Sequence, residues 1–495
     1  MKNKSEQKIN PVTIILIVLI SILFECGSLK SVLADDADLF GEMEESIQRD
    51  DDSASLFDEM ANVDNEPDSA VKWPLLNKIG SNFEGSLNLS SGYFLHDATP
   101  RNGLDTQNEV NEAQLTYATW TGSDTLSLHI SGWLEAGSQK DTWKSSTHWM
   151  QDRDYYRRYI ECNEFYLQLN RTSYDITAGK KIFDTGLSTL YSPANRFKAF
   201  DLHDPVNSKD FGIWQLMLDK YISETRLSIA VFPVYTETKR PAFSSRMWGD
   251  VDEDLLAQSA LIDAQDTFPD LDEKNIGYFA GLKKSVGGWD LFANVHSGTN
   301  PYDVIRDEQG AHISSTIRTT SVASGFSTTV SNLEFHGEAL VNYSENHKDD
   351  DYVNTVFGLT YTTDALFFQN VVITLEYAKE KIIEKQRAEG YTRSSVYARQ
   401  GLDDIFSKLQ LSYDKDLDFE FFTHYELDEK AGLFRFFTKY RFTGNLSFST
   451  AIEYYEVLGD KDESYQSDGI VTIQNITHRN RGKNDRIIAG VQYDF

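Results

Sequence analysis

The chain of 495 residues ends with the stretch RIIAGVQYDF, residues 486–495. Apolar or aromatic residues occupy every second position from Ile487 onward, and Arg486, Gln492 and Asp494 lie between them. A period of two indicates a β-strand with one apolar and one polar face, because successive side chains point to opposite sides. The chain therefore ends in an amphipathic strand.

The same alternation recurs from residue 82 onward. In residues 124–137 leucine and isoleucine alternate with serine, threonine and histidine, and in residues 333–343 apolar residues alternate with Glu334, His336 and Glu338. The pattern predicts about 18 strands. They are residues 82–94, 109–120, 124–137, 160–169, 172–180, 211–219, 225–233, 276–284, 288–296, 321–330, 333–343, 354–362, 370–379, 405–414, 416–424, 431–441, 445–456 and 486–495.

The lengths of the connections separate a barrel from a large soluble sandwich, whose strands alternate in the same way. Every even-numbered connection is short, as at residues 121–123 and 285–287, and the odd-numbered ones are mostly long, as at 138–159 and 234–275. Such parity is typical of a transmembrane barrel with tight turns on one side and long loops on the other. We therefore predict an all-β fold, a transmembrane antiparallel up-and-down β-barrel of about 18 strands with short periplasmic turns and long extracellular loops.

The N-terminus has the pattern of a secretory signal peptide. Three lysines precede an apolar run at residues 11–24, and small residues lead to Ala34. The run is shorter than the ~20 apolar residues that a membrane-spanning helix needs. We expect residues 1–34 to be cleaved near Ala34, so that the mature chain reaches the outer membrane of a Gram-negative cell. Cys26 would leave with this peptide, and Cys162 would remain as a single thiol.

Residues 35–75 form an acidic leader, of which residues 35–70 hold 14 acidic residues and one arginine. Such segments are usually solvated and disordered. Two Leu-Phe-x-Glu-Met units within residues 35–62 also predict a docking site for a periplasmic or inner-membrane transport partner. The docking candidates are Leu39, Phe40, Met43, Leu56, Phe57 and Met60. Residues 76–495 would form the barrel.

Composition excludes several function classes. The net charge is −30 overall and −19 for residues 71–495, which disfavours binding to nucleic acid. The 13% aromatic content fits the girdles of a membrane barrel facing outer-membrane lipid. The chain contains no G-x-S-x-G, H-E-x-x-H or phosphate-loop motif, so we expect no enzyme, cofactor or metal.

If the apolar face meets lipid, the polar face supplies an acidic interior wall with a basic strip on one strand. Such a wall would favour neutral or cationic solutes over anions, unless the charges merely pair with one another. The inward candidates are Glu84, Glu112, Glu135, Glu164, Asp175, Arg226, Glu334, His336, Glu338, Glu376, Lys408, Asp418, Glu420, Arg435, Lys439, Arg441 and Glu453.

The connection at residues 181–210 mixes aromatic, basic and acidic residues with glycine, proline and asparagine. This composition is expected for a loop that folds inward and constricts a pore, although a surface loop has a similar composition. The constriction candidates are Asp184, Asn195, Arg196, Lys198, Asp201 and Asp204.

The last strand, with Tyr493 and the terminal Phe495, resembles the C-terminal signal by which outer-membrane barrels reach the barrel assembly machinery. The strand number and the long loops over residues 80–495 resemble the porin-like group, nearest to 18-stranded alginate-export-type channels. The resemblance implies an outer-membrane channel for small hydrophilic solutes, or the outer-membrane exit of an export system. An adhesin or structural barrel with a blocked lumen is the alternative, and an outer-membrane hydrolase is less favoured.

Overall fold

The computed structural model describes thirteen separate parts of the chain. They are residues 83–98, 106–138, 158–239, 241, 245–248, 275–302, 304–308, 311–345, 349–365, 367–384, 403–428, 430–457 and 483–495. The predicted signal peptide, the acidic leader and the six docking residues lie outside them. These assignments remain predictions.

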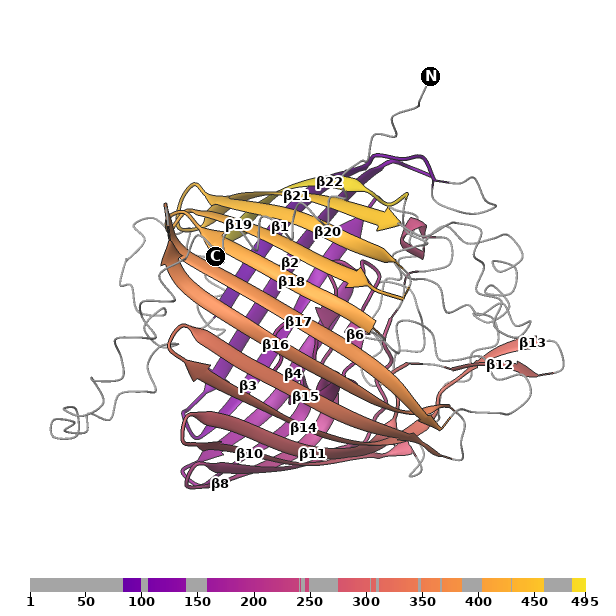
Figure 1. Cartoon of the computed structure of the whole chain (residues 1–495). Coiled ribbons are helices and arrows are strands. Elements are labelled where there is room, and N and C mark those ends of the chain that lie inside the picture. The colour runs from indigo at the N-terminus through magenta and orange to yellow at the C-terminus, as the bar shows by residue number, and fades with distance from the viewer. Residues whose placement is uncertain are drawn as a thin grey trace, which may run out of the picture. The chain divides into compact units, whose positions relative to one another are not determined.

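Eighteen antiparallel strands form one closed sheet (Figure 1). Each strand pairs with the next along the chain, and β1 also pairs with β22, which closes the barrel. The fold class predicted from the sequence is therefore confirmed. The strands are β1 Phe83–Phe94, β2 Glu109–Gly122, β3 Leu126–Gly137, β4 Ile160–Arg171, β5 Tyr174–Lys181, β8 Ile213–Ile222, β9 Thr225–Phe232, β10 Gly277–Val286, β11 Trp289–Thr299, β14 Arg318–Val330, β15 Leu333–Ser344, β16 Asp351–Ala365, β17 Phe368–Glu384, β18 Asp403–Ser412, β19 Leu417–Glu426, β20 Ala431–Arg441, β21 Leu446–Val457 and β22 Arg486–Asp494.

The connections divide between two rims. On the turn rim the strands are joined by two to four residues, as between β4 and β5 or between β20 and β21. On the loop rim most connections are long, and those at 345–350 and 427–430 are the short exceptions. Two small hairpins lie in the connections: β6 Phe200–Asp201 with β7 Lys209–Asp210, and β12 Val304–Glu308 with β13 Ala311–Ser315. In the described residues no helix is long and apolar enough to cross a membrane.

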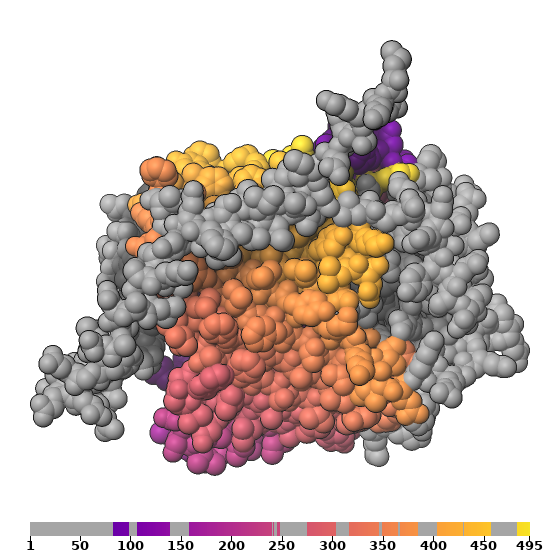
Figure 2. Space-filling model, viewed as in Figure 1, coloured from indigo at the N-terminus to yellow at the C-terminus, as the bar shows by residue number. Residues whose placement is uncertain are grey.

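Side chains alternate between an outer and an inner face of the wall. On β8, Leu216 and Leu218 are 54% and 42% exposed, whereas Gln215, Met217 and Asp219 are buried. Exposed leucine, valine, tyrosine and phenylalanine recur in this way on most of the strands. Figure 2 shows part of the outer surface, where side chains of the strands coloured pink to orange form a continuous face. An apolar belt around a closed barrel is what a lipid bilayer requires.

The seam between the first and last strands is closed by the C-terminal residue. Gly85 and Phe495 exchange both backbone hydrogen bonds, at 3.0 and 2.9 Å, and the Phe495 ring stacks on Phe83 with the centroids 5.9 Å apart. A Cβ atom at Gly85 would lie 2.6 Å from the Phe495 ring and 2.8 Å from the Thr116 carbonyl oxygen. Only glycine therefore leaves room for this ring on the outer face.

We predict that Gly85→Ala weakens the seam, because overpacking a filled site typically costs about 1–3 kcal/mol. The temperature at which the folded barrel changes its migration on a gel should fall. Gly444→Ala is the matched control, since nothing lies within 4 Å of its added methyl group. Equal stability of both variants would contradict this account of the seam.

Candidate functional site

The connection between β5 and β8, residues 182–212, lies inside the barrel and is called the inner loop here. It contains the short helix η3, Pro193–Asn195, and the small strands β6 and β7. Its side chains and backbone contact inward residues of strands on several sides of the wall, from β3 to β22. Three sets of contacts hold it there.

The first set is an aromatic cluster at the start of the loop. The Phe183 ring packs against Phe197, Phe232 and Phe279, with centroids 5.3, 5.4 and 4.9 Å apart. Phe197 also stacks on His296 at 4.5 Å. Aromatic pairs at these separations add to the stabilisation from burial alone. The inner face of β9–β11 is thus apolar under the loop, although the sequence pattern predicts a polar interior.

The second set consists of two inward carboxylates that accept hydrogen bonds from the loop backbone. Glu338 on β15 accepts from the N–H groups of Leu187 and Ser188 at 2.5 and 2.7 Å. It also accepts from the Ser192 hydroxyl at 2.6 Å and, more weakly, from the Ala194 N–H at 3.3 Å. Donors surround both carboxylate oxygens.

Glu376 on β17 binds the next part of the loop. Its carboxylate accepts hydrogen bonds from the N–H groups of Thr189, Leu190 and Tyr191 at 2.8–2.9 Å. His336 lies beside it, with Nε2 2.9 Å from Oε1. The Glu376 side chain is fully buried. A buried carboxylate is costly unless it is hydrogen-bonded, and these donors offset that cost.

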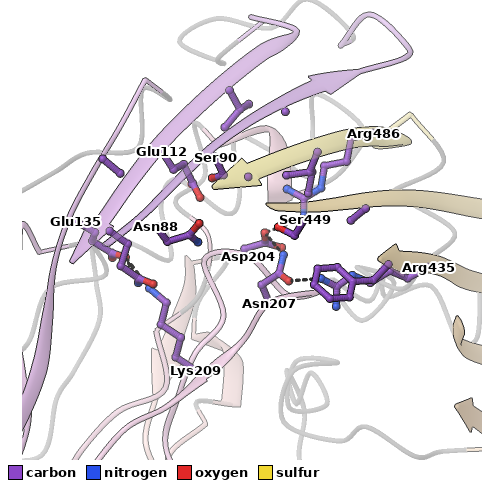
Figure 3. Close-up of a pocket in the computed structure, with 18 of the residues that line it drawn as sticks. Asn88, Ser90, Glu112, Glu135, Asp204, Asn207, Lys209, Arg435, Ser449 and Arg486 are labelled. Carbon is purple, nitrogen blue, oxygen red and sulfur yellow. Dashed lines mark hydrogen bonds and ion pairs between the residues drawn. The ribbon is translucent and has the colours of Figure 1, made fainter. Parts of the chain in front are cut away.

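The third set of contacts lies at the end of the loop and borders a cavity of about 220 Å³ (Figure 3). The Arg486 guanidinium donates to Asp204 at 2.7 Å, and Arg435 donates to the Asn207 side chain at 3.0 Å. The Lys209 ammonium is 2.5 Å from Glu135. Figure 3 shows these residues around an open space, with residues of β1–β3 on one side and those of β20–β22 on the other. The cavity is the candidate passage.

The charged groups that line this passage are balanced in number, and apolar residues such as Phe94, Val110 and Ile488 also line it. Its charged members are three acids, Glu112, Glu135 and Asp204, and three bases, Lys209, Arg435 and Arg486. Asn88, Ser90, Gln114, Asn207 and Ser449 add neutral hydrogen-bonding groups. A ring of this kind has no excess of either sign.

Asp204 keeps its charge near neutral pH. Burial alone would raise the pKa of its carboxyl, but Arg486 and hydrogen bonds from Asn207 and the Val206 N–H lower that pKa to about 2. The Asp204–Arg486 bridge is therefore complete above the ordinary pKa of 3.8 and is lost only as the pH falls through about 2.

The structure gives the six constriction candidates different positions. Asp204 lines the passage, and Asp184 lines a smaller cavity. Asn195 accepts from the Thr185 N–H at 2.8 Å, so it shapes the loop itself. The other three make these contacts: Lys198 with Asp210 at 2.8 Å, Asp201 with His203 at 2.5 Å, and Arg196 over the Tyr352 ring at 4.8 Å.

Most of the inward candidates of the wall have a partner. Glu135, Glu164, Glu338, Glu376 and Arg435 contact the inner loop. The others pair within the wall: Arg226 with Asp219, Lys408 with Glu420, Asp418 with Arg441, Glu453 with Arg486 and Arg435, Glu334 with Ser327, His336 with Glu376, Lys439 with Gln492, and Asp175 with Tyr221. Glu112 lines the passage, and Glu84 lies near Phe495 at the turn rim.

Two charged residues that line the passage, Lys209 and Arg486, were not among the sequence candidates, and neither was their polar neighbour Asn207. Arg486 could have been found, because it falls on the inward parity of the terminal strand. Asn207 and Lys209 lie in the loop, where no alternation indicates direction.

Comparisons with known proteins give the fold context. No family model and no curated protein matches the chain. Solved structures that resemble it include a loop-deletion mutant of OmpT, an outer membrane protein of Vibrio cholerae, with 10% identity over 84% of this chain and 98% of that one and a TM-score of 0.37. OmpF of Salmonella typhi in complex with daunomycin has 11% identity, 84% and 97% coverage and a TM-score of 0.39.

A porin mutant of Rh. blastica has 8% identity, 83% and 99% coverage and a TM-score of 0.38. At such low values these likenesses assign no function. The class of the chain, a closed 18-stranded antiparallel barrel, rests on its own strand pairing.

We predict that the pair of substitutions Glu338→Gln and Glu376→Gln loosens the inner loop. Each replaces charge-assisted hydrogen bonds, and such bonds contribute about 1.5–3 kcal/mol apiece. Limited proteolysis of the folded barrel should then cut within residues 182–212. The control Glu420→Gln removes an inward carboxylate that pairs with Lys408 in the wall. Equal resistance of the double variant and the control would refute the anchoring role.

Proposed function

We propose that this protein is an outer-membrane channel through which small hydrophilic solutes diffuse, without enzymatic activity. The observation that carries the proposal is the cavity between the inner loop and the wall of β1–β3 and β20–β22, which six charged and five neutral hydrogen-bonding residues line together with apolar ones. The apolar outer belt supports a location in a membrane, and only a closed barrel lets strands cross lipid with every backbone group paired.

The balance of charge bears on the solute class. Most charges of the lining are paired locally, Lys209 with Glu135 and Arg486 with Asp204, so that a solute in the passage meets no large excess of either sign. A lining of paired charges offers hydrogen bonds to a dipolar solute without excluding either sign. We propose neutral and zwitterionic solutes as the preferred class, with small cations next.

An export role remains a second proposal. The duplicated Leu-Phe-x-Glu-Met units could recruit a periplasmic partner, which would make the barrel the exit of an export system, as the resemblance to alginate-export-type channels implies. The passage is lined by as many acidic as basic residues, so it offers no strongly basic path for a polyanion. Small solutes therefore fit the interior better.

A structural or adhesive barrel is the rival function, and one observation favours it. The inner loop is held inside the barrel by aromatic packing, hydrogen bonds to buried carboxylates and ion pairs. If the inner loop closes the lumen, the protein would act by binding partners at its long loops rather than by passing solutes.

Planar-bilayer recording separates these functions. The channel function predicts stable unitary steps with weak selectivity between potassium and chloride. Purified, folded protein that inserts into the bilayer but gives no steps would overturn it in favour of the blocked barrel.

Changing one charge of the lining should change ion selectivity. We predict that Arg435→Gln raises the preference for potassium over chloride, because one of the three bases of the lining is lost. Lys284→Gln is the control, since this exposed lysine has the parity of the outward residues Tyr278 and Leu282. A reversal potential that moves equally in both variants would argue against passage beside Arg435.

A further inference from the structure

Arg246, in the connection between β9 and β10, fills a socket at the loop rim. The side chain is only 4% exposed. Its guanidinium donates to the Asn108 side-chain oxygen at 2.7 Å, to the Lys483 carbonyl at 2.8 Å and to the His96 carbonyl. Asn484 accepts a longer bond from Nε at 3.4 Å and donates back to the Arg246 carbonyl at 3.1 Å.

An aromatic ring forms the floor of the socket. The Arg246 Cζ atom lies 4.1 Å from the centroid of Phe94, which is within the range of a strong cation–π contact. The neighbouring Met247 is 3% exposed and packs with Phe94 and Val110. Both Phe94 and Val110 also line the candidate passage. The socket and the passage thus share a wall.

The socket joins parts of the rim that are far apart around the barrel. Its oxygens come from the connection between β1 and β2 and from the connection between β21 and β22. Arg246 comes from the connection between β9 and β10. Between β1 and β9 the sheet runs through β2, β3, β4, β5 and β8. These connections are not adjacent around the barrel, so contacts between neighbouring loops do not explain why Arg246 reaches these oxygens. The short helix η4, Arg246–Trp248, is held at the loop rim, where its Met247 packs against Phe94 and Val110 of the passage wall.

The chemistry of the socket fits a guanidinium group. Oxygens on several sides accept the fork of N–H donors, and the flat cation stacks on a ring face; an ammonium ion would satisfy fewer of these acceptors. We propose that this socket is a guanidinium-recognition site that the chain's own Arg246 occupies, so that Arg246–Trp248 narrows the outer end of the passage. The inference rests on the proposed channel function and adds a ligand class to it.

The first test is the conductance of Arg246→Ala. Removal of the side chain should release η4 and raise the unitary conductance, and millimolar methylguanidinium should lower it again by refilling the socket. Methylammonium at the same concentration should not lower the conductance, because it lacks the planar fork of N–H donors. Arg318→Ala is the control, since Arg318 also bonds at the loop rim, to Glu345 and to the Ile276 carbonyl, but does not line the passage. A conductance unchanged from wild type, or equal effects of the two cations, would overturn the proposal.

The second test does not require a conducting channel. Met247→Cys, in a chain with Cys26→Ser and Cys162→Ser, reports whether η4 leaves the rim. Its reaction with a water-soluble maleimide should quicken at least about tenfold when Arg246→Ala is added, because even one lost bond to a charged group is worth that factor. Methylguanidinium should lower the labelling rate again if the socket binds a guanidinium group. An unchanged labelling rate would overturn the inference even in a conducting barrel, and absence of current with faster labelling would overturn only the channel function.

Discussion

Two carboxylates inside the barrel, those of Glu338 and Glu376, fix the position of the loop around which the rest of the interior is arranged. Burying either carboxylate without hydrogen-bond donors would be costly, and on the wall His336 lies within hydrogen-bond distance of Glu376. Consecutive backbone N–H groups of residues 187–191 provide these donors. The wall and the loop therefore satisfy each other: the loop pairs the buried charges, and the charges hold the loop across the lumen.

The position of the loop decides where solvent can pass. Near its start, aromatic side chains seal the loop against β9–β11, and near its middle the carboxylates hold it against β15 and β17. The candidate passage lies on the opposite side, beside β1–β3 and β20–β22, where the loop presents Asp204, Asn207 and Lys209, and a smaller cavity remains beside β8–β11. The charges of the passage are thus shared between the loop and the wall, and neither part alone defines its selectivity.

The strand pattern could be predicted from the sequence because it depends on local periodicity. Each strand must present one face to an apolar and one to a polar environment, and that requirement is visible in short windows such as residues 486–495. The inward direction of Glu338 and Glu376 followed from the same rule. Their role did not, because their partners are backbone N–H groups, which every residue except proline has and no motif marks.

The apolar part of the interior was also beyond the local pattern. Phe232 and Phe279 point inward against the loop, so their strands are apolar on both faces where the loop covers them. Which wall residues the loop meets depends on barrel closure, which brings together residues far apart in the chain.

The position of the inner loop is tested most directly by a cross-link between Ala194 of the loop and Ala323 of β14, which lie in one buried cluster. After Ala194→Cys and Ala323→Cys, in a chain with Cys26→Ser and Cys162→Ser, a short bifunctional thiol reagent should join the two introduced cysteines in the folded barrel. Two freely labelled, unlinked cysteines would contradict an inner loop held across the lumen.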